Sequence, residues 1–344
     1  MALFSRDLGI DLGTITTRIA EGDQVILREP TVVAVHLDQQ KIVEIGQEAL
    51  NMYGRVSEEM EVSRPLRDGV VAYFEYTYLF LREMIKRVTP MRMFKPTVMI
   101  THPYGVTSVE RRAVHEAALE ALGARSNALL VPQPLAAALG VDLPIGMPSG
   151  NMIVSLGGGC TQAAVIAVHD IVSGETLREG GLTLDDAIST YVRRKYGLII
   201  GQPTAENIKK TIGAAVPQDE ELRMELQGQD QISGLPKPFT LTTSEVVDAL
   251  QEPLDRIFET IRQVLEKTPP ELASDVIDRG IALCGGGALL RGVDKLMTQK
   301  LGIPTYLVDD PENAVAIGAY RAMEIYPILQ RRSCSATCPS FSLI

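Results

Sequence analysis

The sequence predicts an α/β fold made of two related halves, each a mixed β-sheet flanked by helices. Apolar strand-like runs alternate with amphipathic helical runs along most of the chain, which is typical of sheets covered by helices on both faces. A strand, a tight glycine turn and a second strand occur at residues 8–21 and again at residues 152–168. The 344 residues also exceed the roughly 250–300 at which a single hydrophobic core stops growing. We therefore expect two halves with a cleft between them.

The composition narrows the functional class. Hydrophobic residues make up 45% of the chain and charged residues 22%, which is typical of a soluble globular protein. A net charge of −10 argues against nucleic acid as the main partner, because neutralising phosphates needs a basic surface. The sequence has neither an apolar run of about 18 residues nor a signal peptide. We expect a cytoplasmic protein.

Helix-end signals organise the first half. Residues 76–88 carry apolar side chains at helical spacing. Residues 107–123 begin with the capping-box pair Thr107 and Glu110, which predicts a second helix. The remaining expected elements are a β excursion at 29–50, a buried strand at 96–103 and a short helix of small residues at 133–140.

The second half is read in the same way. Residues 184–197 predict a helix that ends at a glycine. Residues 243–267 are a long helical stretch that Pro253 should bend or divide. The other expected elements are a polar β excursion at 226–243, a strand, glycine turn and helix start at 280–292, and a closing helix at 313–326. From residue 331 the chain is rich in serine and cysteine, so 331–344 should be a disordered tail.

Three glycine-rich turns follow apolar strands. They are Asp11-Leu12-Gly13-Thr14, the triple glycine at 157–159 and the triple glycine at 285–287. A lone glycine turn is weak support for a ligand site, but three such turns in two similar halves favour a shared phosphate-binding cleft. Asp11 would hold hydrated Mg²⁺, because this hard cation prefers carboxylate and water oxygens. Thr14 would offer its hydroxyl and backbone N–H to the phosphates.

These motifs, read in order, resemble a known family. The series "IDLGT", "RPLRDGV", "QPLAAALG", "GGG" and "TPPELASDVIDRGIALCGGGALLRG" resembles the actin-like superfamily and, more narrowly, the MreB family of bacterial actins. The resemblance covers about residues 7–324. It implies an actin-like fold, binding of ATP or ADP with Mg²⁺, and head-to-tail filaments at the inner face of the cell membrane that govern cell shape. It also implies the cell-wall elongation machinery as a partner.

The resemblance places the subdomains and the site. Subdomain IA would comprise 1–31, 65–140 and 312–330, IB 32–64, IIA 141–181 and 243–311, and IIB 182–242. The nucleotide-binding set would be Asp11, which also holds the metal, with Gly13, Thr14, Thr16, Gly157, Gly158, Gly159, Glu206, Lys209, Gly285, Gly286, Gly287 and Ala288. On periodicity alone, Glu206 and Lys209 are equally consistent with solvent-facing charges on an amphipathic helix.

Several positions depart from the family pattern. Gln133 replaces the Glu that would position the attacking water, Ser155 replaces the Asp of the second phosphate turn, and Gln162 replaces a Glu after the glycines. Hydrolysis needs positioned water and compensated charge, and losing one such group typically costs about 10²–10³ in rate. We expect nucleotide binding with weakened hydrolysis, a slow ATPase at most. There are two alternatives to this expectation. The protein hydrolyses ATP at the ordinary rate of the family, or it has lost nucleotide binding as well as hydrolysis.

Membrane contact has a local basis. Residues 89–96, "TPMRMFKP", place Met93 and Phe94 among cations in an expected loop, which suits a lipid headgroup boundary. Leu3 and Phe4 near the N-terminus would add to the same face. The alternative is that Met93 and Phe94 pack into the core.

Other functions of the same fold fit less well. A heat-shock chaperone would need a substrate-binding region after the nucleotide core, and a small-molecule kinase would need a carboxylate base that Ser155 does not supply. The second candidate is a non-polymerising or co-assembling regulatory pseudo-ATPase, whose partner would be an active MreB paralogue.

Overall fold

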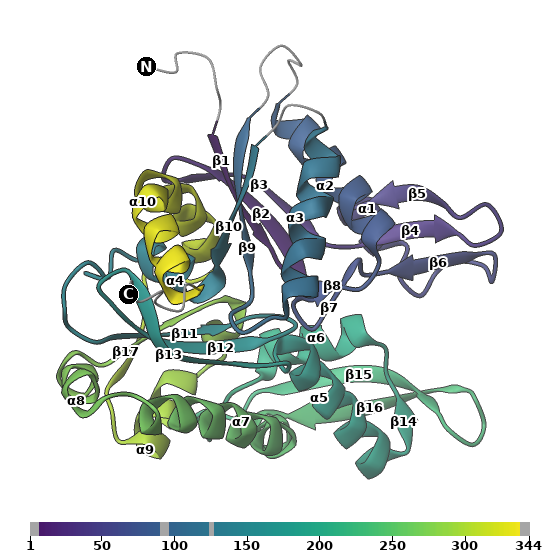
Figure 1. Cartoon of the computed structure of the whole chain (residues 1–344). Coiled ribbons are helices and arrows are strands. Elements are labelled where there is room, and N and C mark those ends of the chain that lie inside the picture. The colour runs from purple at the N-terminus through teal and green to yellow at the C-terminus, as the bar shows by residue number, and fades with distance from the viewer. Residues whose placement is uncertain (1–6, 90–95, 124–126, 338–344) are drawn as a thin grey trace, which may run out of the picture.

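The structure is a computed structural model, and it describes residues 7–89, 96–123 and 127–337, with side chains to residue 330. Two lobes are stacked on one another, each built on a five-stranded sheet (Figure 1). The first sheet has the order β10-β9-β1-β2-β3 and the second β13-β12-β11-β17-β18. The strands of the first sheet are β1 (Asp7–Leu12), β2 (Thr16–Glu21), β3 (Gln24–Pro30), β9 (Thr97–His102) and β10 (Asn127–Pro132).

The two sheets have the same topology. The strands of the second sheet are β11 (Asn151–Leu156), β12 (Thr161–Ala167), β13 (Asp170–Leu177), β17 (Ile281–Cys284) and β18 (Thr305–Leu307). In each sheet three consecutive strands form an antiparallel meander, and two later strands add in parallel beside the first of them. This repetition agrees with the two related halves that the sequence predicts.

Helices cover both faces of each sheet. Around the first sheet, α2 (Phe74–Val88) and α3 (Ser108–Leu122) lie on one face, and α4 (Gln133–Gly140) and α10 (Ala314–Thr337) on the other (Figure 1). The helices of the second half are α5 (Gly181–Tyr196), α6 (Gln202–Ile212), α7 (Thr243–Glu266), α8 (Pro270–Arg279) and α9 (Val293–Leu301), with a 3₁₀ turn η1 (Gly286–Leu289). Both faces of the central strands are buried, which explains their unbroken apolar runs.

Each lobe also carries a small sheet. In the first lobe β4 (Val33–His36), β5 (Lys41–Ile45) and β6 (Met60–Ser63) pack with α1 (Gln47–Asn51), and a short β7 (Leu66–Arg67) and β8 (Val70–Val71) ribbon follows. In the second lobe β14 (Leu198–Ile199), β15 (Arg223–Asp230) and β16 (Pro236–Thr242) form the other small sheet. The predicted β excursions at 29–50 and 226–243 contain β4, β5 and β16 and most of β15, whereas β6 and β14 lie outside them. The subdomain boundaries themselves stay a prediction.

Helix α4 lies at the junction between the lobes. It contacts β9 and β10 of the first sheet, β11 and β12 of the second, and α10 along its length. Glycines allow the two helices to touch backbone to backbone, because a Cβ at Gly318 would collide with the Ala136 carbonyl and a Cβ at Gly140 with the Ala314 carbonyl. One core of apolar side chains from both sheets surrounds this pair, so the lobes share packing at this point.

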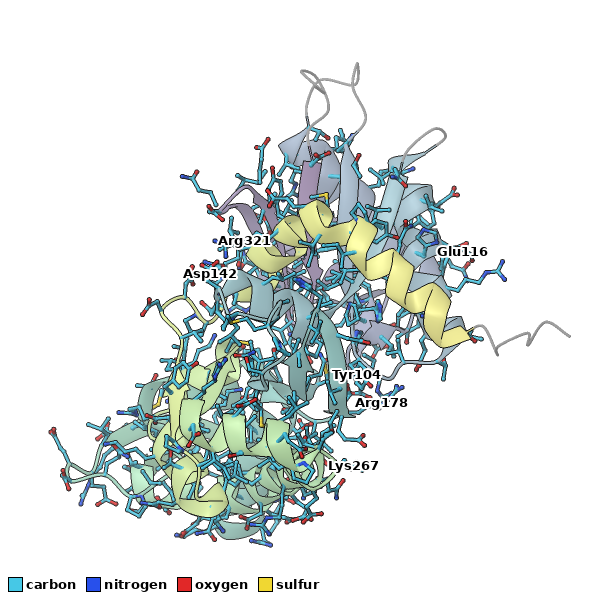
Figure 2. The ribbon with its side chains drawn as sticks, turned by 60° about the vertical axis from the view of Figure 1, so that its left-hand side comes forward. Tyr104, Glu116, Asp142, Arg178, Lys267 and Arg321 are labelled. Atoms are coloured by element: carbon cyan, nitrogen blue, oxygen red, sulfur yellow. The ribbon has the colours of Figure 1, made fainter. Side chains whose placement is uncertain are left out.

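Polar contacts join the lobes on another side. Arg178, at the end of β13, pairs with Glu110 of α3 at 2.7 Å, and Thr176 donates to the Tyr104 carbonyl at 2.7 Å. Figure 2 shows Tyr104 and Arg178 close to one another at the junction. A separate ion pair, 2.8 Å long, joins Arg321 of α10 to Asp142 in the loop after α4.

Several local predictions can be compared directly. The Thr107–Glu110 capping box is present in both directions. Of the two predicted effects of Pro253, division of the helix is wrong, because α7 is one helix whose apolar face, including Leu250 and Leu254, is buried in the second core. A bend at Pro253 stays a prediction. Helix α10 continues to Thr337, past the expected start of the disordered tail, and residues 338–344 lie outside the described residues. No helix in the described ranges is long and apolar enough to cross a membrane.

Candidate functional site

The main candidate site is a cavity of about 470 Å³ between the lobes, where the three glycine turns meet. Most residues predicted for the site line this cavity: Asp11, Gly13, Thr14, Thr16, Gln133, Ser155, Gly157, Gly158, Gly159, Glu206, Lys209, Gly285, Gly286 and Gly287. Ala288 does not, because it is turned into the core of the second lobe and buried there. Leu3, Phe4, Met93 and Phe94 lie outside the described residues.

The first two glycine turns face each other. A Cβ at Gly158 would collide with the Ile15 side chain, and one at Gly159 would collide with the Thr14 side chain. The Thr14 hydroxyl accepts a hydrogen bond from the Gly69 N–H at 3.0 Å. Only glycine allows the two turns to approach this closely, so backbone N–H groups from both lobes line the same space.

The third turn is held in a conformation that favours glycine. Gly285 has a φ of +87°, and a Cβ there would collide with the Leu156 carbonyl. Its N–H donates to the Pro311 carbonyl at 2.7 Å. The turn is therefore fixed against β11 and against the segment that leads into α10.

Asp11 lies at the end of β1 and is buried. Its Oδ1 accepts hydrogen bonds from the Thr101 hydroxyl at 3.3 Å and from the Gln133 amide at 3.4 Å. Burial raises the pKa of the Asp11 carboxyl above its ordinary value, although the nearby Arg18 guanidinium acts in the opposite direction. An ionised carboxylate at this place is stabilised by added positive charge.

Gln133 belongs to a chain of amides that crosses the cleft. Its Nε2 donates to Asp11, while its Oε1 accepts a hydrogen bond from the Gln162 Nε2. The Gln162 Oε1 in turn accepts from the Tyr104 N–H at 2.8 Å. Since Gln133 and Tyr104 belong to the first lobe and Gln162 to β12 of the second, this chain links the lobes beneath the phosphate turns.

Ser155 lies on β11 beside this chain and is buried. It is paired in register with Gln162 on one side and Cys284 on the other. Burial raises the pKa of Cys284 to about 12, so the thiol is neutral. The floor of the second lobe therefore carries neutral polar groups at Ser155, Gln162 and Cys284 and no carboxylate at any of these three positions.

Lys209 and Glu206 reach the cavity from α6. The Lys209 Nζ is 2.7 Å from Asp185 Oδ1 and donates to the Gly181 carbonyl at 2.6 Å. Only 14% of the Lys209 side chain is exposed, so it does not face solvent, whereas Glu206 pairs with Lys210 at 2.6 Å. Burial raises the pKa of Asp185 although Lys209 opposes it. Sequence reasoning missed Asp185, whose only signal was a carboxylate at a core-facing position of a predicted helix.

A row of charges was also missed. Arg18 lies opposite Asp11 in the β1–β2 register, and Arg28 lies opposite Arg18 in the β2–β3 register. Glu312, just before α10, accepts from both arginines through Oε1, at 2.9 Å and 2.8 Å. All four side chains line the cavity. The predicted hairpin at residues 8–21 could have revealed the Asp11–Arg18 part of this row, since directly paired residues on neighbouring strands share a face.

The residues present fit a nucleotide and one hard cation. No group of three or more His, Cys, Asp or Glu that could hold a metal occurs in the described part of the chain. A Mg²⁺ ion in a phosphate site needs only one or two carboxylates, with water and phosphate oxygens completing its shell. The buried Asp11 provides one, and all three glycine turns line the same cavity.

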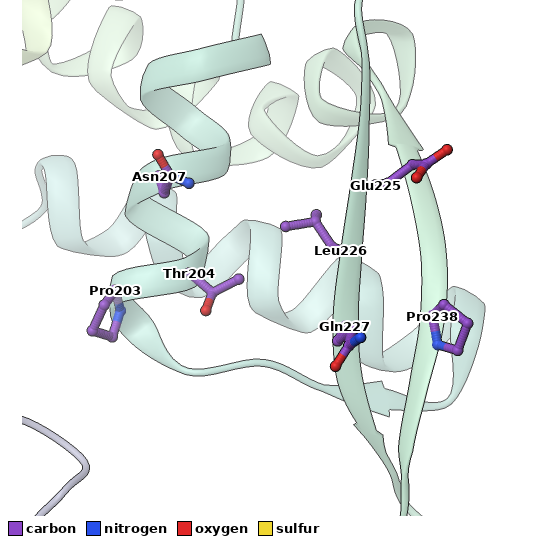
Figure 3. Close-up of a pocket in the computed structure, with 7 residues that line it drawn as sticks. All are labelled: Pro203, Thr204, Asn207, Glu225, Leu226, Gln227 and Pro238. Atoms are coloured by element: carbon purple, nitrogen blue, oxygen red, sulfur yellow. The ribbon is translucent and has the colours of Figure 1, made fainter.

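A second hollow of about 600 Å³ lies on the small sheet of the second lobe (Figure 3). It is lined by Pro203, Thr204 and Asn207 of α6 and by residues of β15 and β16. Glu225 is the single charged side chain in that lining. This hollow lacks the convergent charges and glycine turns of the cleft, so we assign no chemistry to it.

Comparison with known proteins agrees with the architecture. A model of the MreB/Mbl protein family matches residues 5–331. The chain is 43% identical over 330 residues to the cell shape-determining protein MreB of Escherichia coli K12, covering 94% of each chain. It is 40% identical to the cell shape-determining protein Mbl of Bacillus subtilis 168, covering 97% of this chain and 100% of that one.

A solved structure supports the same fold. The crystal structure of MreB5 of Spiroplasma citri bound to ADP matches with a TM-score of 0.88 and 32% identity, over 95% of this chain and 98% of that chain. The fold is therefore actin-like, as the sequence predicts.

Proposed function

Since the chain belongs to the MreB/Mbl family, we propose that it is a cytoskeletal protein that binds ATP or ADP with Mg²⁺ in the cleft and forms filaments that govern cell shape. The observation that carries the nucleotide part is the convergence of the three glycine turns and the buried Asp11 on one cavity. Filament formation rests on family membership.

Each part of the cleft has a role in this proposal. The turns at 13–14, 157–159 and 285–287 present backbone N–H groups to the phosphates. Asp11 holds the metal, which when bound neutralises phosphate charge. Lys209 and Glu206 approach the ribose and base from α6, and Asp185 keeps Lys209 in place through their 2.7 Å ion pair.

Hydrolysis is expected to be slow for a geometric reason. To direct an attacking water, Gln133 would have to accept its hydrogen bond through Oε1, where the Gln162 amide already takes one of the two lone pairs. Ser155 adds no charge that could orient water or metal. A water would have only the remaining lone pair of a neutral amide, which is a weaker acceptor than a carboxylate.

The test uses purified full-length protein. Calorimetric titration with ATP and Mg²⁺ should show binding, electron microscopy should show filaments, and phosphate release should be much slower than for a relative that has both acids. Absence of ATP binding would overturn the nucleotide site. Turnover equal to that of such a relative would overturn the weakened hydrolysis while leaving the site in place.

A second function remains open at the same site. The neutral groups at 133, 155 and 162 also suit a regulatory pseudo-ATPase that caps or co-assembles with an active paralogue. Mixing the protein with an active MreB separates the two proposals. Incorporation into mixed filaments, without filaments of the protein alone, would favour the regulatory function.

We also propose that the protein acts in the cytoplasm, at the inner face of the cell membrane, together with the cell-wall elongation machinery. The support is family membership and the apolar residues Leu3, Phe4, Met93 and Phe94 that the sequence places beside cations. The subdomain ranges given above belong to the same proposal.

A further inference from the structure

The charge row beside the glycine turns is unusual in its composition. Arg18 and Arg28 are directly paired on β2 and β3, and like charges in this position destabilise a sheet. Glu312 reaches in from outside the sheet and bonds both guanidinium groups. The positive charges of the two arginines are balanced by the negative charges of two carboxylates, Asp11 and Glu312. The site thus contains its own counter-charges.

Arg18 differs from Arg28 in its surroundings. The side chain of Arg18 is 9% exposed, whereas that of Arg28 is 55% exposed. A guanidinium has five N–H donors. Within the described residues Nη2 of Arg18 donates to Glu312, while its Nε is buried without any hydrogen-bond partner. A buried donor without a partner costs free energy, so Nε would gain from an acceptor oxygen brought within its reach, and the Arg18 side chain lines the cavity.

The position of Arg18 relative to Asp11 identifies that acceptor. The two residues are opposite each other on β1 and β2, so they share the cleft-facing side of the sheet. Asp11 is the residue to which we assign the metal. A guanidinium next to it lies where phosphate oxygens and the cation would meet, and it offers paired donors that suit phosphate.

We propose that Arg18 is a resident cation of the phosphate subsite, held by Glu312, which allows nucleotide to bind even when divalent metal is removed. This inference rests on the proposed nucleotide site. The positive charge that a metal ion supplies at Asp11 is provided in part by a side chain that cannot dissociate. Glu312 is the positioning residue, since it contacts Arg18 and fixes it to the segment before α10.

The experiment measures the dissociation constants of ATP, ADP and adenosine, once with Mg²⁺ and once with excess EDTA. Wild type is compared with Arg18→Leu, with Arg18→Lys, which keeps the charge, and with Arg87→Leu. Arg87 is a matched control because its side chain is 38% exposed, pairs with Glu29 and does not line the cavity. Melting temperatures are measured alongside, and Arg18→Lys provides a reading of its own if Arg18→Leu does not fold.

In EDTA, wild type should bind ATP within about tenfold of its affinity in Mg²⁺. Arg18→Leu should weaken ATP binding in EDTA by roughly tenfold to a hundredfold, which is the range for loss of a charge-assisted hydrogen bond. The loss should be smaller in Mg²⁺, and adenosine binding should not change. Arg18→Lys should lie between wild type and Arg18→Leu, and Arg87→Leu should match wild type.

Two outcomes would overturn the inference. One is equal ATP affinity of wild type and Arg18→Leu in EDTA, with Arg18→Lys also unchanged. The other is wild-type binding that is present in Mg²⁺ and absent in EDTA. Both leave the proposed nucleotide site standing. Failure of wild type to bind ATP in Mg²⁺ would instead refute the proposed function itself.

Discussion

The side-chain amide of Gln162 donates to the side-chain carbonyl of Gln133 across the boundary between the two lobes. Gln133 stands at the first residue of α4, and Gln162 on β12 of the second sheet. An amide can donate and accept at once, so the pair needs no proton and no charge. Two carboxylates in the same place would repel unless they shared a proton. The hydrogen bond between the two amides therefore does not depend on the protonation of either side chain.

The first prediction concerns hydrolysis. The double variant Gln133→Glu with Ser155→Asp should release phosphate roughly 10²-fold faster, since each positioned acid is worth about 10²–10³ in other enzymes and the Gln162 amide still occupies one oxygen of the new carboxylate. Single-turnover phosphate release measures it. The exposed Gln251→Glu on α7 is the control for added charge. An unchanged rate with retained ATP affinity would show that these positions do not limit hydrolysis.

The second prediction concerns Asp11. Its raised pKa means that the ionised carboxylate destabilises the folded state at neutral pH when no cation is bound. Asp11→Asn should therefore raise the melting temperature of the nucleotide-free protein in EDTA, by about 2 °C for each 1 kcal/mol gained. The same variant should lose Mg²⁺-dependent ATP affinity. A lower melting temperature in EDTA would mean that the charge itself stabilises the fold.

The third prediction concerns the buried ion pair of Lys209 and Asp185. Lys209→Met should cost about 3–5 kcal/mol at neutral pH, because it leaves the carboxylate, which is fully buried, without a counter-charge. The double variant Lys209→Met with Asp185→Leu should recover much of that loss. Urea denaturation of both variants measures the difference.

This pair also gives a pH dependence. The folded-state pKa of Asp185 is already above its ordinary value, so its ionisation in the folded state opposes folding. Without Lys209 that pKa rises further. The deficit of Lys209→Met should therefore be complete above the folded-state pKa of Asp185 and shrink as the pH falls through that pKa toward the ordinary value of an aspartate. A deficit that stays constant as the pH is lowered from neutrality to that ordinary value would contradict this account of the charge.

The fourth prediction concerns the third glycine turn. Gly285→Ala should destabilise the protein and weaken ATP binding, because the added Cβ meets the Leu156 carbonyl in addition to straining a φ of +87°. Gly22→Ala is the matched control, since Gly22 has a φ of +63° with nothing within 4 Å of the added atom. Gly22→Ala therefore introduces the backbone strain alone, about 1–2 kcal/mol. Equal effects of the two substitutions on unfolding and ATP affinity would exclude a steric role.

The fifth prediction concerns the membrane. Replacing Met93 and Phe94 by Ser should abolish co-sedimentation with liposomes that contain anionic lipid, because apolar side chains beside cations anchor at the headgroup boundary. Replacing Ile26 and Leu37, exposed apolar residues of the first lobe, is the control. If the variant with Ser at positions 93 and 94 sediments with liposomes as well as wild type does, these residues are not the membrane contact.

The glycine turns of the site could be predicted, because local sequence determines them. The turn at Gly13 and the triple glycines follow apolar strands, and two sheets of the same topology bring these turns together in one cavity. Ala288, predicted to belong to the nucleotide-binding set, does not line the cavity because it is one step past its turn, where η1 directs it into the core. Pro253 did not divide α7, since burial of one apolar face outweighs the hydrogen bond that proline removes.

The remaining site residues depend on contacts that no local pattern encodes. Glu312 reaches Arg18 from a segment almost three hundred positions later in the chain. The role of Asp185 is visible only from its ion pair with Lys209, which lies on the next helix. The Gln133–Gln162 hydrogen bond requires both lobes to be placed first. Such long-range pairs are set by tertiary geometry.

The backbone contact between α4 and α10 leaves no room for a larger side chain. At Gly140 and Gly318 the two helices touch backbone to backbone, and any Cβ at either position would overlap a carbonyl of the other helix. A larger residue at either position would therefore force α4 away from α10. Because α4 also contacts β11 and β12 of the second sheet, that displacement would reach the junction between the lobes.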